Sequence, residues 1–356
     1  MDQRGVALQQ RSFPSVRLNH RAICSLRKTK VFKNIHSEQV GSLDFSADGE
    51  LVAVAGDDGL ISLYSAVQGK LLKTIPVKRY GCGVVRFGNH KSAVLCASKP
   101  VVDAGGGVGG TPAPAVCAVS WDDHIRYLSI TENKYIRYFR GHRARVVSIA
   151  VTPNDDSFIS AALDGTMRLW DIRYPHCAGV LQVRGRPAVA VDPSGLVAAV
   201  AFSDLLKLVI KLYDLRKWDE GPFIDFESNV TNSEPTVLKF SGDGRSLLVG
   251  AAEPHPRIQL LDAFNGRLQT LCRGHANDQA YELDACFSPD SQYVLSGSED
   301  ATIHIWERAT GNPVHVLHGH SAHLRALGFN PQYAMVVSAC QNVVFWQPDP
   351  ATLDYV

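Results

Sequence analysis

The stretch that decides the fold is Gly141–Asp171, which reads GHRARVVSIAVTPNDDSFISAALDGTMRLWD. An apolar run at 146–151 and a second one beginning at Phe158 are separated by a polar turn cluster at 152–156. Asp164-Gly165 then precedes a run in which apolar and polar residues alternate, and Asp-Gly in this position is a strong hairpin signal. The stretch therefore predicts three short antiparallel strands joined by two hairpins.

Four side chains of this stretch are predicted to meet in one hydrogen-bonded network. They are His142 before the first strand, Ser160 on the second, Asp164 in the turn and Trp170 on the third. The indole N–H can donate to the hydroxyl, the hydroxyl to the imidazole, and the imidazole to the carboxylate, so that every buried donor has an acceptor. A catalytic Ser/His/Asp set is the competing interpretation. The pattern matches the WD repeat, the four-stranded blade of a β-propeller, and therefore favours a structural role.

The whole chain repeats this unit seven times. The residues at the position of Trp170 are Tyr64, Leu128, Trp170, Tyr213, Leu261, Trp306 and Trp346, and successive members lie 40 to 48 residues apart after a first gap of 64. Blades of this kind repeat every 40–45 residues or so, about the spacing seen here. The predicted fold is all-β, a seven-bladed WD-repeat β-propeller. An alternating segment at 29–35 is predicted to supply the outer strand of the seventh blade and to close the ring.

Other units keep the network to different degrees. The sixth unit has His275, Ser296, Asp300 and Trp306, and we expect the same network there as in the third. The seventh has His320, Ser338 and Trp346 but lacks the turn aspartate and offers Asn342 nearby, while the first has no Gly-His pair. The first and seventh networks are therefore expected to be incomplete.

Charge and composition argue against several classes of protein. The 356 residues carry a net charge of +1, which gives no bulk attraction to nucleic acids or membranes. No apolar run is long enough to predict a transmembrane helix, and the N-terminus lacks the apolar core of a secretory signal. Eight scattered cysteines without a CxxC pair predict reduced thiols, no metal site and no cofactor.

The propeller is predicted to span residues 28–349. Residues 1–27 carry little pattern and predict a disordered N-terminal arm, and 350–356 form a short tail. In the second blade, 99–115 is rich in Gly, Pro and Ala, which predicts a mobile insert between the second and third strands. A phosphate-binding glycine loop is the alternative for this insert, but no Lys-Ser/Thr follows the glycines.

Several stretches are more specific than the generic repeat. They are 125–129 (IRYLS), 134–142 (KYIRYFRGH), 158–160 (FIS), 166–171 (TMRLWD), 211–216 (KLYDLR), 220–223 (EGPF), 262–264 (DAF), 289–292 (PDSQ) and 345–346 (FW). Together they resemble the WD-repeat subunit shared by the SET-domain COMPASS histone methyltransferase complex and a nuclear protein phosphatase 1 complex. The resemblance covers about residues 29–348. The chain departs from that family at its N-terminal arm, at 100–114 and near 205–209.

The resemblance implies a non-enzymatic scaffold in the nucleus, present as a monomer within a hetero-complex. The expected partners are COMPASS methyltransferase subunits, protein phosphatase 1 regulatory subunits and the phosphorylated tail of RNA polymerase II, which links the chain to chromatin and transcription termination. A substrate-recognition adaptor of a ubiquitin ligase is the alternative function on the same fold. An enzyme is not indicated, because no metal cluster, carboxylate pair or nucleophile motif occurs outside the structural network.

One face of the predicted disc carries a cluster of cations and an aromatic residue. The residues are Lys78, Arg79 and Tyr80 before the second blade, Arg143 and Arg145 in the third, and Arg186 before the fourth. Arginine binds phosphate oxygens bidentately, so the cluster predicts a binding site for a phosphorylated peptide. For any single one of these residues, a solvated charged rim is the simpler interpretation.

Overall fold

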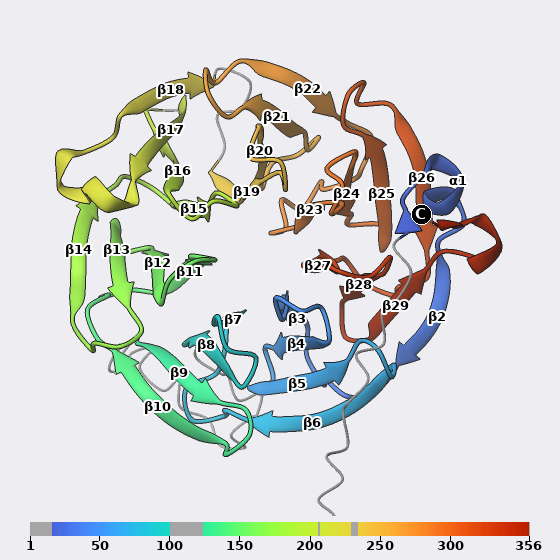
Figure 1. Cartoon of the computed structure of the whole chain (residues 1–356), viewed down its shortest axis with the longest axis horizontal. Coiled ribbons are helices and arrows are strands. Elements are labelled where there is room, and N and C mark those ends of the chain that lie inside the picture. Colours follow the sequence, from blue (N-terminus) through green and yellow to red (C-terminus); the bar gives the residue numbers. More distant parts are fainter. Residues whose placement is uncertain (1–15, 100–123, 206, 229–233, 356) are drawn as a thin grey trace, which may run out of the picture.

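The computed structural model describes residues 16–99, 124–205, 207–228 and 234–355. In this part of the chain, seven four-stranded sheets stand like blades around a central opening, and a two-stranded ribbon lies outside the ring (Figure 1). This arrangement confirms the predicted seven-bladed β-propeller. The predicted mobile insert at 99–115 lies outside the described residues except for Lys99.

The first three blades each run outward from the opening in chain order. Blade one consists of β3 (Val40–Phe45), β4 (Leu51–Gly56), β5 (Leu60–Ser65) and β6 (Lys70–Pro76). Blade two consists of β7 (Val84–Phe87), β8 (Ala93–Ala97), β9 (Ile125–Ser129) and β10 (Lys134–Phe139). Blade three consists of β11 (Val146–Val151), β12 (Ser157–Ala162), β13 (Thr166–Asp171) and β14 (Cys177–Gln182).

Blades four to six follow the same order. Blade four consists of β15 (Ala188–Val191), β16 (Val197–Asp204), β17 (Lys207–Asp214) and β18 (Ile224–Ser228), with the 3₁₀ helix η1 (Leu215–Glu220) before β18. Blade five consists of β19 (Pro235–Phe240), β20 (Ser246–Ala251), β21 (Ile258–Asp262) and β22 (Leu268–Cys272). Blade six consists of β23 (Ala285–Phe287), β24 (Tyr293–Gly297), β25 (Thr302–Glu307) and β26 (Pro313–His318). The extra residues near 205–209 lengthen the β16–β17 hairpin, whose paired strands are eight residues each.

Blade seven combines both ends of the chain, as the sequence predicts. Its strands are β27 (Ala326–Phe329), β28 (Val336–Ala339), β29 (Val343–Gln347) and, outermost, β2 (Arg27–Phe32), which pairs antiparallel with β29. The outer strand ends before residue 35, because the chain turns away at Asn34, whose φ of 58° lies in the left-handed region. The backbone N–H of Val40 donates to the carbonyl of Cys340 at 2.7 Å and joins blade one to blade seven.

The prediction that residues 1–27 form a disordered arm is wrong for residues 16–27. β1 (Val16–Arg17) pairs with β30 (Asp354–Tyr355), which follows the 3₁₀ helix η2 (Pro350–Thr352), and α1 (His20–Cys24) lies against the ring beside β26 (Figure 1). The Asn19 side chain caps α1 by accepting the N–H of Ala22 at 2.7 Å. Ile23 is fully buried among core residues of blades six and seven, and this burial orders the segment.

Apolar layers between neighbouring blades form the core, and one layer lies between each adjacent pair. Between blades two and three, for example, the Phe139 ring meets the Phe158 ring edge-on at 4.9 Å, and Phe158 stacks on Trp170 at 6.1 Å. Each buried side chain of this size contributes about 1.5–3 kcal/mol. Each blade therefore depends on both of its neighbours to cover its apolar residues.

Hydrogen bonds around the opening repeat with the period of the blades. The Asp44 carboxylate accepts the backbone N–H of Phe87 at 2.7 Å, and that of Asp284 accepts the N–H of Leu327 at 3.2 Å. Donor and acceptor lie 43 residues apart in both cases. Adjacent blades are therefore tied together near the axis as well as through their apolar layers.

The packing of α1 predicts that its anchor is part of the fold. Ile23→Ala should lower the free energy of unfolding by about 2–4 kcal/mol, because it leaves a cavity between blades six and seven. Val31→Ala on β2, where Val31 is 41% exposed, is the matched control and should change stability by less than about 1 kcal/mol. Urea denaturation followed by tryptophan fluorescence measures both. Equal, small effects of the two substitutions would contradict the packing of Ile23 and support the prediction of a disordered arm.

Candidate interaction surface

The third blade contains all four members of the network that its sequence predicts. The indole N–H of Trp170 donates to the Ser160 hydroxyl at 2.8 Å, and Ser160 Oγ lies 2.7 Å from His142 Nε2. On the other side of the ring, His142 Nδ1 lies 3.2 Å from the Asp164 carboxylate. This order assigns the imidazole proton to Nδ1, so that the hydroxyl donates to Nε2 and Nδ1–H donates to the carboxylate.

The network holds a neutral imidazole beside an ionised carboxylate. Burial lowers the pKa of His142 to about 4, although the negative charge of Asp164 opposes the shift. Burial alone would raise the pKa of Asp164, but hydrogen bonds from the Arg143 backbone and the Thr166 side chain bring it below its ordinary value. A serine whose hydroxyl is 0% exposed cannot meet a substrate, so this set has a structural role.

Blades seven and one form partial versions of the network. In blade seven, Trp346 donates to Ser338 at 2.7 Å, Ser338 lies 2.7 Å from His320 Nε2, and the Cys340 thiol lies 3.2 Å from Nδ1 in place of a carboxylate. In blade one, His36 pairs with Asp58 at 3.2 Å although no glycine precedes it. The spacing of 22 residues, equal to that of His142 and Asp164, is the signal that would have identified this pair.

In blade six the predicted network does not form. The Trp306 indole donates to the carbonyl of Arg273 at 2.9 Å, and the Ser296 hydroxyl donates to the carbonyl of Gly297 at 2.9 Å. His275 instead packs edge-on against Trp306 at 5.4 Å. The spacing of 25 residues between His275 and Asp300 is three residues longer than that between His142 and Asp164 in blade three.

Three arginines converge on one carboxylate where the loops meet around the central opening. Arg186 contacts Glu282, and Arg145 and Arg325 each approach it at 3.6 Å. Burial alone would raise the pKa of Glu282, but the hydrogen bond and charge of Arg186, with the charges of Arg145 and Arg325, hold it below its ordinary value. Three positive charges therefore face a single ionised carboxylate.

A second carboxylate extends this cluster toward blade two. Asp57 pairs with Arg325 at 3.3 Å and with Lys99 at 2.5 Å. Four cations and two carboxylates thus share a half-buried site, which keeps an excess of two positive charges. We call these six residues the arginine cluster; they are Asp57, Lys99, Arg145, Arg186, Glu282 and Arg325.

Tyr80 lies in an adjoining aromatic group and not among the arginines. Its ring lies 3.6 Å from the guanidinium carbon of the buried Arg126 and 6.1 Å from the ring of Tyr135. The carbonyl of Tyr80 accepts the backbone N–H of Lys99 at 3.1 Å, so Lys99 connects the aromatic group to the arginine cluster. Such a guanidinium–aromatic contact stabilises the pair and presents a flat, polarised surface.

The remaining predicted residues lie on the rim. Lys78, Arg79 and Arg143 are exposed; Arg79 lies 5.1 Å from the Tyr80 ring, and the backbone N–H of Arg143 donates to Asp164. The structure therefore brings Arg145 and Arg186 together and leaves Arg143, Lys78 and Arg79 outside that contact. Sequence reasoning missed the other four members of the arginine cluster, which are Asp57, Lys99, Glu282 and Arg325. Position is the signal for Arg325, because it directly precedes an inner strand, as Arg145 does.

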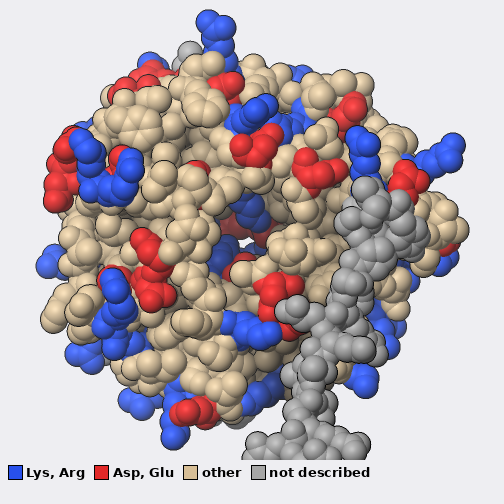
Figure 2. All heavy atoms as spheres, in the orientation of Figure 1, with Lys and Arg blue, Asp and Glu red and all other residues tan. Residues whose placement is uncertain are grey.

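Both basic and acidic side chains lie at the central opening (Figure 2). Lys239 on β19 pairs with Asp284 at 2.8 Å, and Arg86 on β7 donates to the Ser42 hydroxyl at 3.1 Å. Among the described residues, no group of three or more His, Cys, Asp or Glu side chains is placed to hold a metal ion. No helix in the described ranges is long and apolar enough to cross a membrane.

The difference between blades three and six predicts different costs for the same substitution. Ser160→Ala removes the acceptor of Trp170 and the donor to His142, and should cost about 1–3 kcal/mol of stability because both partners stay buried and unpaired. Ser296→Ala removes one hydrogen bond to a backbone carbonyl and should cost about 1 kcal/mol. Urea denaturation of the two variants makes the comparison; equal costs would contradict the unequal networks.

Buried neutral histidines predict a loss of stability in mild acid. Burial lowers the pKa of His142, His275 and His320 to about 4, whereas an unfolded histidine has a pKa of about 6.5. As the pH falls between these values, the unfolded state takes up protons first, so stability is full above about pH 6.5 and decreases toward pH 4. We expect a slope on the order of 1 kcal/mol per pH unit for each histidine.

Denaturation at several pH values tests this slope, and His142→Gln should reduce it by the share of one histidine, on the order of 1 kcal/mol per pH unit. A stability that stays constant between about pH 6.5 and pH 5 would contradict the neutral, buried state of the three rings.

Comparison with known proteins supports the same architecture. The model described as "WD domain, G-beta repeat" matches residues 133–171, 266–307 and 311–346, and "Anaphase-promoting complex subunit 4 WD40 domain" matches residues 1–95. The chain is 37% identical over 335 residues to "WD repeat-containing protein 82" of Drosophila melanogaster. The aligned region covers 94% of this chain and 98% of that protein.

Two fungal relatives are also similar along most of their length. The chain is 32% identical to "COMPASS component SWD2" of Saccharomyces cerevisiae, covering 89% of this chain and 96% of that protein. It is 27% identical to "Set1 complex component swd2" of Schizosaccharomyces pombe, covering 91% and 97%. The chain therefore belongs to the family of WD-repeat proteins that includes WD repeat-containing protein 82 and the COMPASS component SWD2.

Proposed function

We propose that this protein is a non-enzymatic scaffold subunit of a nuclear COMPASS-type histone methyltransferase complex, and that it recognises the phosphorylated tail of RNA polymerase II. Membership in the complex is supported by relatives that bear the names of COMPASS and Set1 complex components. The absence of a catalytic role is supported by the burial of the Ser160 hydroxyl, the nucleophile of the candidate Ser/His/Asp set in blade three.

The observation that carries the recognition of phosphate is the arginine cluster. Arg186 and Arg325 have side chains that are only 13% and 17% exposed, so their guanidinium groups are held in place before a ligand arrives. A phosphorylated side chain carries a charge of about −1.5 to −2 and three acceptor oxygens. It matches the two excess positive charges of the cluster, and arginine can bind its oxygens bidentately.

Glu282 acts in this proposal as the group that a phosphate replaces. It holds Arg145, Arg186 and Arg325 close together in the free protein, and a phosphate gives the same guanidinium groups a stronger partner. Tyr80, held by Arg126, then offers an aromatic surface for residues that flank the phosphate, and the exposed Arg143, Lys78 and Arg79 add attraction at the rim.

A nuclear protein phosphatase 1 complex with a role in transcription termination is a second proposed setting for the same scaffold. A ubiquitin-ligase adaptor remains the competing function, because WD-repeat propellers serve both kinds of complex. Affinity purification from nuclear extract with mass spectrometry separates them: methyltransferase or phosphatase 1 regulatory subunits support the scaffold, and cullin-type partners would replace it with the adaptor.

Charge reversal of the surface should weaken phosphopeptide binding. Arg143→Glu combined with Arg145→Glu should raise the Kd for a phosphorylated polymerase-tail peptide by about tenfold or more, because charged hydrogen bonds of about 1.5–3 kcal/mol are lost. Fluorescence anisotropy with the phosphorylated and unphosphorylated peptides measures the effect. Arg173→Glu is the control. Arg173 is an exposed arginine of the same blade, but it pairs with Asp171 at the ends of the strands that lie away from Arg143 and Arg145.

Glu282→Gln tests the exchange directly. It keeps the size of the side chain and removes its charge, so phosphopeptide affinity should rise and its dependence on salt should steepen. Unchanged affinity in the Arg143/Arg145 double variant would reject this site, whatever complex contains the protein.

A further inference from the structure

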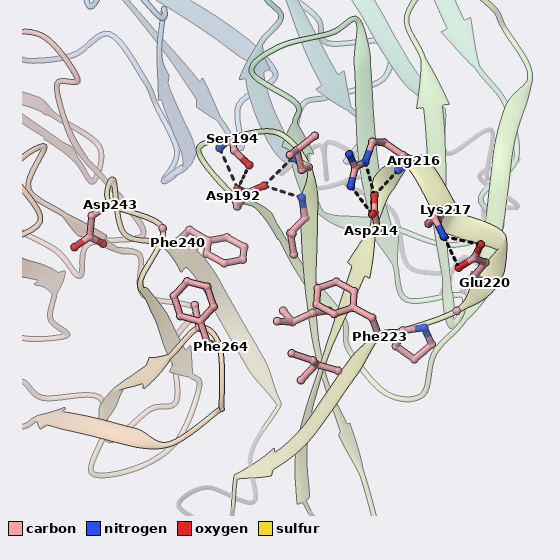
Figure 3. Close-up of a pocket in the computed structure, with 18 residues that line it drawn as sticks. Asp192, Ser194, Asp214, Arg216, Lys217, Glu220, Phe223, Phe240, Asp243 and Phe264 are labelled. Atoms are coloured by element: carbon pink, nitrogen blue, oxygen red, sulfur yellow. Dashed lines mark hydrogen bonds and ion pairs between the residues drawn. The ribbon is translucent and has the colours of Figure 1, made fainter.

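A large apolar groove lies between blades four and five, away from the arginine cluster. It has a volume of about 780 Å³, within the range of sites that bind ligands of substantial size. Figure 3 shows Phe223 on the blade-four side facing Phe240 and Phe264 on the blade-five side. The walls of the groove are the turns that follow the first and third strands of blades four and five. His142 and Asp164 of blade three lie at the other ends of the strands, on the opposite face of the disc.

The blade-four wall is an addition to the repeat. The connection between the third and fourth strands is nine residues long there, 215–223, against four or five residues in blades one, two, three, five and six. The additional residues form η1, and Trp218 anchors this helix by packing against Tyr213 at 5.4 Å. Trp218 also fills the space beside Gly179 of blade three, where a Cβ would lie 2.5 Å from the indole. The wall is therefore fixed to its neighbour and not a loose loop.

The groove gathers large apolar side chains that the fold leaves exposed. Phe264 is 69% exposed, Phe223 is 54% exposed and Leu196 is 41% exposed. Phe264 belongs to the short turn between β21 and β22, so its ring stands out from the blade without a packing role. Aromatic residues grouped in this way on a surface mark a site for a partner.

Four carboxylates and two cations line the groove, and one of the carboxylates, Asp243, pairs with Arg308 at 2.8 Å. Two of its carboxylates, Asp214 and Glu220, already hold the two cations that line it, Arg216 at 2.8 Å and Lys217 at 3.1 Å. Asp192 accepts the backbone N–H groups of Ser194, Leu196 and Val197 at 2.7–3.0 Å (Figure 3). The Ser194 hydroxyl also donates to Asp192, so four hydrogen bonds satisfy the two carboxylate oxygens. No cation pairs with Asp192 among the described residues, so its negative charge is not cancelled by a positive one.

We infer that this groove binds a linear segment of a partner protein that inserts apolar side chains between Phe223 and Phe264 and places a Lys or Arg beside Asp192. The exposed rings supply the apolar contact, and the negative charge of Asp192, which no described cation cancels, favours a basic neighbour. Because the groove and the arginine cluster occupy opposite faces of the disc, both can be filled at once. This site is independent of the proposed phosphopeptide site.

Selection from a phage-displayed library of random linear peptides on the purified full chain tests the inference. The enriched peptides should share a pair of apolar residues next to Lys or Arg, and one of them, labelled with fluorescein, serves as the probe for anisotropy. Phe264→Ser should weaken its binding by about tenfold or more. Tyr174→Ser is the matched control, because Tyr174 is 60% exposed in the corresponding turn of blade three. Asp192→Asn should reduce the preference for a basic residue, and the Arg143/Arg145 double variant should bind normally.

Three outcomes would overturn the inference. One is a selection in which the enriched peptides lack the apolar and basic pattern, or in which no peptide is enriched more on the unchanged chain than on the Phe264→Ser variant. Another is binding of the probe that Phe264→Ser leaves unchanged while its thermal unfolding shows a folded protein. The third is concentration-dependent dimerisation that Phe264→Ser abolishes, which would make a second copy of the chain the occupant.

Discussion

The pairing of β2 with β29 is the contact on which the disc depends, because it joins segments more than 300 residues apart. The Thr29 hydroxyl, for example, donates to the carbonyl of Phe345 across 316 residues of sequence. Without this strand, blade seven would have three strands and an open edge, and the apolar layers on its two sides would lose part of their cover. Closure also brings α1 into the core, so the N-terminal segment is a structural part of the ring.

Closure determines which loops meet, and so where charge accumulates. The innermost strands converge on the axis, and residues that directly precede them are crowded together at one mouth of the opening. Arg145, Arg325 and Glu282 come from three different blades and meet only because the ring is closed. An open array with the same sequence would carry isolated surface charges, which bind phosphate weakly.

The period of the repeat made the number of blades and the closing strand predictable, whereas loop length decided the details. The pattern of residue types in blade six is the same as in blade three, yet three additional residues between His275 and Asp300 prevent the network. The spacing of His36 and Asp58 is correct although the sequence before His36 is unusual. Cys340 meets His320 in a role that residue type alone does not suggest. Contacts between blades, such as that of Arg186 with Glu282, depend on closure and have no local signal.

The two faces of the disc offer different chemistry because different turns build them. The mouth that carries the arginine cluster is formed by loops entering the inner strands, and Arg145, Arg186, Glu282 and Arg325 line it. The groove beside Phe223 and Phe264 is formed by turns at the other strand ends, far enough from the axis to expose aromatic rings. Since the blades between them are rigid, packed sheets, a ligand on one face does not obstruct the other. In the function proposed above, this separation leaves one face for a phosphorylated tail and the other for a partner protein.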